Sequence, residues 1–196
     1  MSRVTQFNRR VKKDSPIVKE KPLMKKFIFR KKTGGDIYGY LEILRQELED
    51  IHKMQVFEFS TEKCICSSIL PNDNTYVYSG TDMNRSFLKK AVMRFRNSGF
   101  NDTALYVARA DALPFYDESF NICLCFLSVN FFSDILNVFG EIRRMLVPGG
   151  IFICSVPVHE RNSLTKTCQK YGFSFERILF ENGTLLCFKA ICNKDA

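Results

Sequence analysis

The sequence predicts an α/β domain in which helices cover both faces of a mostly parallel sheet. Residues 120–157 give the first indication, because an apolar run, an amphipathic helix, a Pro-Gly-Gly turn and a second apolar run follow one another there. A strand–helix–strand unit of this kind joins parallel strands by a right-handed crossover. The second indication is Asn182-Gly183 between two alternating apolar runs, which predicts an antiparallel hairpin late in the chain.

Helical spacing of apolar residues predicts five helices. Leu41, Leu44 and Leu48 mark the first of them. Pro-Asn-Asp-Asn at 71–74 ends the second, and Pro-Gly-Gly at 148–150 ends the fourth, because glycine permits a sharp reversal. The five helices are expected at residues 36 to about 54, 61–70, 84–96, 134–146 and 163–170.

Seven strands are expected between and after these helices. Short apolar runs bounded by turn residues are typical of strands buried on both faces of a parallel sheet. The last two runs alternate instead, as the strands of a hairpin do. The strands are expected at residues 55–59, 76–81, 105–110, 122–129, 151–156, 174–180 and 185–192.

Charge divides the chain into a basic tail, residues 1–35, and a domain, residues 36–196. The tail holds 12 Lys and Arg against two acidic residues, so it contributes +10 to a net charge of +8. Three interpretations of the tail stay open: a disordered arm without a specific partner, an amphipathic targeting segment, or an arm that contacts nucleic acid.

The eight cysteines are expected to be reduced core residues. Several fall within the predicted strands, where a thiol behaves as a small apolar group: Cys123, Cys125, Cys154 and Cys187. The Cys-x-Cys pairs lack the spacing of zinc ligands, so no metal site is expected. No run reaches the roughly 18 apolar residues of a membrane span, and no secretory segment is expected at the start. We therefore expect an intracellular, reducing compartment: cytoplasm, nucleus or mitochondrion.

Three short motifs carry a resemblance to a known family. Residues 110–115 read Ala-Asp-Ala-Leu-Pro-Phe, 119–121 read Ser-Phe-Asn, and 144–150 read Arg-Met-Leu-Val-Pro-Gly-Gly. At these intervals they resemble class I S-adenosylmethionine-dependent methyltransferases, of the small-molecule type that includes ubiquinone and thiol methyltransferases. Asn121 departs from the family's usual Asp. The resemblance covers about residues 36–192, and it implies a Rossmann-like seven-stranded sheet of order 3-2-1-4-5-7-6.

The resemblance also implies a site for S-adenosylmethionine at the ends of the first four strands. Asp82, with Met83 beside it, stands where the family binds the ribose hydroxyls. Asp111 and Ala112 stand where it holds adenine. The implied cofactor-binding residues are Glu58, Ser60, Asp82, Met83, Asp111, Ala112, Cys125 and Phe126.

The glycine-rich loop of the family is degenerate in this chain. Ser60, Glu62 and Cys64 occupy its three glycine positions, where the family's backbone approaches the methionine part of the cofactor. Cofactor binding is therefore expected to be weak or lost. No catalytic residue is predicted, since residues 129–132 read Val-Asn-Phe-Phe and offer no general base.

Two functions stay open from the sequence. The first is a divergent methyltransferase with a small or lipophilic acceptor. The second is an inactive pseudo-methyltransferase that serves as a binding module or assembly factor. Such a module would bind a protein partner, or RNA through its basic tail.

Overall fold

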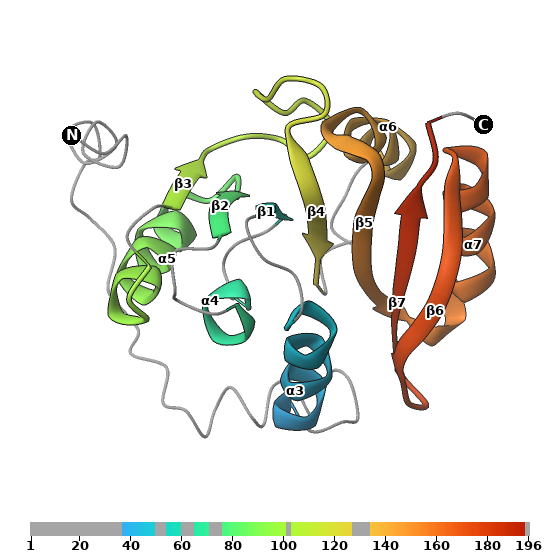
Figure 1. Cartoon of the computed structure of the whole chain (residues 1–196), viewed down its shortest axis with the longest axis horizontal. Coiled ribbons are helices and arrows are strands. Elements are labelled where there is room, and N and C mark those ends of the chain that lie inside the picture. Colours follow the sequence, from blue (N-terminus) through green and yellow to red (C-terminus); the bar gives the residue numbers. More distant parts are fainter. Residues whose placement is uncertain are drawn as a thin grey trace.

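Seven strands form one sheet in the computed structural model of the chain, in the order β3-β2-β1-β4-β5-β7-β6 (Figure 1). The strands are β1 (Met54–Phe59), β2 (Tyr76–Thr81), β3 (Thr103–Tyr106), β4 (Phe120–Cys125), β5 (Leu146–Pro157), β6 (Phe173–Glu181) and β7 (Leu185–Cys192). β7 pairs antiparallel with β5 on one side and β6 on the other, whereas β1 to β5 pair in parallel. The predicted strand order and its antiparallel insertion are confirmed.

The structure describes residues 37–49, 54–59, 65–70, 76–100, 103–126 and 134–194. The predicted tail, the residues at the lost glycine positions and the segment 127–133 lie outside these ranges. Within them the helices are α3 (Ile37–Leu48), α4 (Cys66–Ile69), α5 (Arg85–Asn97), α6 (Ile135–Met145) and α7 (Arg161–Lys170), with a 3-10 turn at Val158–Glu160. None of the described helices is both long and apolar enough to cross a membrane.

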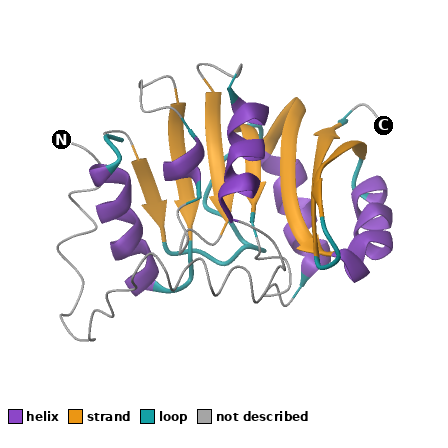
Figure 2. Ribbon diagram, turned by 90° about the horizontal axis from the view of Figure 1, so that it is seen from below, coloured by secondary structure: helices purple, strands orange, loops and turns teal. Residues whose placement is uncertain are grey.

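Two apolar clusters show that helices cover both faces of the sheet (Figure 2). On one face, Tyr40 and Leu44 of α3 and Phe95 of α5 pack with Tyr78 and Ile153 of the sheet. On the other face, α6 and α7 pack against the opposite sides of the same strands. Burial of apolar side chains on each face is the main source of the fold's stability.

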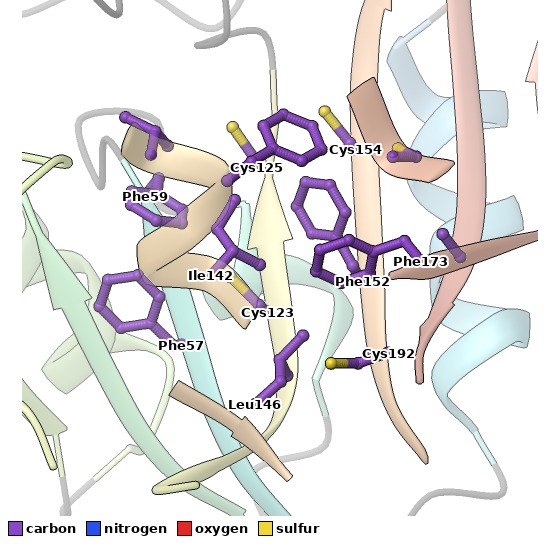
Figure 3. Close-up of a cluster of buried hydrophobic side chains, with 14 of the residues drawn as sticks. Phe57, Phe59, Cys123, Cys125, Ile142, Leu146, Phe152, Cys154, Phe173 and Cys192 are labelled. Carbon is purple, nitrogen blue, oxygen red and sulfur yellow. The ribbon is translucent and has the colours of Figure 1, made fainter. Parts of the chain in front are cut away.

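The apolar cluster between the sheet and helices α6 and α7 contains most of the core cysteines (Figure 3). Cys123 and Cys125 of β4 and Cys154 of β5 are buried and free, and Cys125 lies in register with Cys154. Burial raises the pKa of the Cys123 and Cys154 thiols well above the usual value. The expected core position of these cysteines is confirmed. Among the described residues, no group of three His, Cys, Asp or Glu side chains could hold a metal ion.

Several predicted boundaries were wrong, and the backbone shows why. The first helix ends at Leu48 rather than near residue 54, where β1 begins. The third strand is Thr103–Tyr106 rather than 105–110, because the chain then turns and Arg109 bridges Ala112 outside the sheet.

The Pro-Gly-Gly segment lies inside a strand instead of forming a separate turn. Leu146, predicted as the last residue of the helix, already has an extended backbone and pairs with Phe120 of β4. Gly149 has φ +75°, which few other residues adopt. A Cβ on Gly150 would lie 2.8 Å from the Val147 carbonyl oxygen, so the strand needs glycine at this bend.

Candidate functional site

Most of the predicted site residues that the structure describes lie at or just beyond the carboxyl ends of β1, β2 and β4, and the other two lie in the turn after β3. Glu58, near the end of β1, lies in register with Gly80 of β2 and Leu124 of β4. Asp82 follows β2 directly, and its N–H donates to the Tyr106 carbonyl at the end of β3, at 3.2 Å. In open α/β sheets, ligands bind at this carboxyl edge of the parallel strands. Ser60 lies outside the described residues.

Glu58 is held within the core rather than at the surface. Its side chain is 1% exposed, and Tyr78 Oη donates to its Oε2 at 2.6 Å. Backbone amides of Ile65 and Cys66, where α4 begins, also bond to it. Burial raises the pKa of this carboxyl to about 7, although these donors oppose the shift. Glu58 therefore links β1 to β2 and to the start of α4 through hydrogen bonds within the core.

Asp82 and Met83 form the part of the site next to β2. Asp82 is half-buried, and its Oδ1 accepts from the Asn84 N–H at 2.8 Å. Asn84 in turn caps α5 by accepting from the Ser86 N–H. Met83 is 69% exposed, which is unusual for a large apolar side chain. A fixed carboxylate beside an open apolar side chain suits a sugar that carries an aromatic base.

Asp111 carries an ion pair that the sequence interpretation missed. Arg109 donates from Nε to Oδ1 at 2.8 Å and from Nη2 to Oδ2 at 2.6 Å. The guanidinium holds the pKa of the Asp111 carboxyl below its usual value. The neighbouring Ala112 is exposed. The sequence did contain an indication of this pair, because Arg109 stands only two residues before Asp111 and oppositely charged side chains that close can meet.

A clamp made by Glu141 and Arg144 of α6 holds the loop that follows Asp111. Glu141 Oε2 accepts from the Leu113 N–H at 2.8 Å, and Arg144 Nη2 donates to the Leu113 carbonyl at 3.2 Å. Arg144 Nη1 also donates to the Phe115 carbonyl at 2.7 Å and to Asp117 at 2.9 Å. The two side chains bond to each other as well. The sequence interpretation missed both, although their i, i+3 spacing on an amphipathic helix was readable.

The end of β4 is closed by an aromatic side chain from α3. Cys125 and Phe126 are buried, and the Phe126 ring meets the edge of Tyr40 at 6.3 Å between centroids. Tyr40 is itself buried, and its hydroxyl lies 2.7 Å from Ser155 Oγ of β5. Cys125 and Phe126 therefore form the buried surface at the end of β4. Tyr40 was not predicted as a site residue, because its i, i+4 spacing to Leu44 indicates only that both residues lie on the buried face of the helix.

Comparison with known proteins supplies an independent view of the chain. A family model described as methyltransferase domain matches residues 64–154. The mitochondrial 2-methoxy-6-polyprenyl-1,4-benzoquinol methylase of Xenopus laevis is 29% identical over 102 residues, which are 51% of this chain and 33% of that protein. A demethylmenaquinone methyltransferase of Bacillus velezensis is 29% identical over 75 residues, which are 38% of this chain and 32% of that protein. The chain thus matches about a third of the length of these relatives.

Solved structures extend the likeness to the fold as a whole. A SAM dependent methyltransferase from Aquifex aeolicus superposes with a TM-score of 0.70, covering 89% of this chain and 100% of that one at 12% identity. At such low identity the likeness concerns the fold alone. Together with the family model, it confirms the resemblance that the sequence motifs indicated.

Proposed function

We propose that this class I methyltransferase-like chain is a divergent S-adenosylmethionine-dependent methyltransferase with a small or lipophilic acceptor. The observation that carries the proposal is the position of Asp82 directly after β2 and of Asp111 in the turn after the neighbouring strand β3. Two carboxylates beyond adjacent parallel strands supply hydrogen-bond acceptors for a ribose diol and for a base amino group. The family match and the quinone methylase relatives support the same activity.

The residues present fit the nucleoside half of the cofactor in part. Asp82 is fixed by Asn84 and would accept from ribose hydroxyls, while the exposed Met83 side chain would lie against the base. Ala112 adds no bulk beside the Asp111 carboxylate. Asp111 itself is already bonded to Arg109, so the adenine position is not open as it stands.

The sulfonium of a bound cofactor would supply an activated methyl group for in-line displacement. The chain's own contribution to such a reaction is to bind, orient and exclude water, which needs no general base unless the acceptor must lose a proton. The buried rings of Tyr40 and Phe126 close the end of β4 with apolar surface. The lipophilic acceptor is proposed from the quinone methylase relatives.

Binding of the cofactor by the full chain is the direct test, with isothermal calorimetry as the measurement. We expect weak binding of S-adenosylmethionine and S-adenosylhomocysteine, because three non-glycine residues replace the loop glycines. Strain of about 3 kcal/mol would weaken affinity more than a hundredfold. Asp82→Ala should reduce the remaining affinity at least about tenfold, since it removes the ribose acceptor.

Glu181→Ala is the matched control, because it removes a carboxylate from β6 at the opposite end of the sheet. Its cofactor affinity should equal that of the wild type. Equal affinity of wild type and Asp82→Ala would contradict the assigned ribose contact. Absence of heat with either ligand would contradict the proposed activity.

A pseudo-methyltransferase is the second candidate, favoured by Ser60, Glu62 and Cys64 at the glycine positions. In this case the domain would act as a binding module or assembly factor, and the basic tail could supply an RNA contact. Such a contact must weaken steeply with salt, because binding to phosphates releases counterions. The buried thiols support a reducing, intracellular compartment for either function.

A further inference from the structure

The Arg109–Asp111 ion pair occupies the carboxylate that the proposed function assigns to adenine. Both guanidinium bonds are short, at 2.8 and 2.6 Å, and they use both carboxylate oxygens. Bidentate pairing of this kind is the strongest geometry that arginine and a carboxylate make. The Asp111 side chain is 15% exposed and that of Arg109 is 63% exposed. The guanidinium therefore lies on the solvent side of the pair.

The backbone of the loop holds Arg109 and Asp111 in a fixed turn. Arg109 and Ala112 form an antiparallel bridge, and the Ala112 N–H donates to the Arg109 carbonyl at 3.3 Å. This tight turn holds the two side chains on the same side. The next residue, Leu113, is clamped at both its N–H and its carbonyl by Glu141 and Arg144. The loop therefore presents the closed pair from a fixed backbone.

We propose that Arg109 is an intramolecular competitor for the Asp111 carboxylate, so that a nucleoside amino group binds there only after displacing the guanidinium. The inference rests on the proposed function, because it concerns the same adenine position. Displacement requires no repacking, since most of the Arg109 side chain already faces solvent. A mobile guanidinium would then act as a gate that lowers affinity for the nucleoside.

The gate has a chemical signature that distinguishes it from simple loosening of the loop. An open carboxylate accepts from the exocyclic amino group of adenosine, whereas the closed pair faces the ligand with guanidinium N–H donors. Inosine carries a carbonyl at that position, and a carbonyl oxygen cannot donate a hydrogen bond to the open carboxylate. Removing the guanidinium should therefore favour adenosine and leave inosine unchanged or weaker.

Calorimetric titration of the full chain with adenosine and inosine tests the gate, because both probes are uncharged. Arg109→Ala should bind adenosine about two- to fivefold more tightly than wild type, with no gain for inosine. Raising NaCl from about 50 to 500 mM should strengthen adenosine binding by the wild type, because salt screens the competing pair. The same change should leave Arg109→Ala unaffected. Lys89→Ala, which removes an exposed cation from α5, should match the wild type throughout.

Two outcomes would overturn the inference while the proposed function stands. One is binding of S-adenosylmethionine by the wild type with equal adenosine affinity in Arg109→Ala. The other is weaker adenosine binding in Arg109→Ala, which would make the guanidinium part of the site. Failure of every variant to bind either adenosine or S-adenosylmethionine would overturn the inference and the proposed function together.

Discussion

Replacing Arg144 by alanine is expected to lower the free energy of unfolding by about 2–4 kcal/mol, measured by urea denaturation. The Arg144 side chain is 28% exposed, and its guanidinium bonds to Glu141, to Asp117 and to the carbonyls of Leu113 and Phe115. Its loss leaves these carbonyls and the Glu141 carboxylate without their charged partner, and unpaired groups of that kind are costly when partly buried.

The control for Arg144 is Arg161→Ala, which breaks an exposed pair with Glu181 and should change stability by less than about 1 kcal/mol. Arg144→Lys keeps the charge but cannot span both carbonyls, so it should fall between wild type and alanine. An effect of Arg144→Ala no larger than that of Arg161→Ala would show that the clamp does not hold the loop. Since the clamped loop follows Asp111 directly, cofactor affinity should fall in Arg144→Ala as well.

Stability is expected to decrease as the pH rises from 5 to 8, and Glu58→Gln should remove much of that decrease. The pKa of the Glu58 carboxyl is about 7 in the fold and 4.5 ordinarily, so the folded state binds the proton more tightly than the unfolded chain. Its contribution is therefore fully present below 4.5 and is lost as pH rises through 7. The loss amounts to about 1.4 kcal/mol per pH unit, or roughly 3 kcal/mol in total.

Urea denaturation at pH 5, 6, 7 and 8 checks this dependence on Glu58. Glutamine has the same shape and stays neutral, and its carbonyl still accepts from Tyr78 or from an amide of α4. The control is Glu118→Gln, which neutralises an exposed carboxylate and should retain the wild-type slope. Identical slopes in wild type and Glu58→Gln would show that Glu58 is not protonated within the fold at neutral pH.

The strand order could be predicted because local signals and the family motifs agreed on it. Apolar runs located every strand, and Asn182-Gly183 located the hairpin that inserts β7 antiparallel. Boundaries were less accurate where tertiary pairing decided them. Leu146 continues the apolar spacing of α6, yet it joins β5 because Phe120 pairs with it across the sheet.

The positions of the candidate site residues relative to the strands could be predicted, but the contacts between elements could not. The order of the elements predicted that Asp82 follows β2 and that Asp111 comes after β3. Arg109, Glu141 and Arg144 act through hydrogen bonds to a loop whose path the sequence does not specify. The i, i+3 spacing of Glu141 and Arg144 indicates that they can pair with each other, but it does not indicate that they bond to a distant loop.

The order of the strands also sets the order in which a growing chain can fold. β1 lies between β2 and β4, and its Gln55 N–H reaches the Asn121 side chain 66 residues later. The centre of the sheet therefore cannot close until β4 has left the ribosome. β6 is synthesised before β7, but among the described strands its backbone pairs only with β7, so β5 keeps an open edge until Leu185–Cys192 emerges. A chain released before that strand would expose an unpaired apolar edge, which is a template for aggregation.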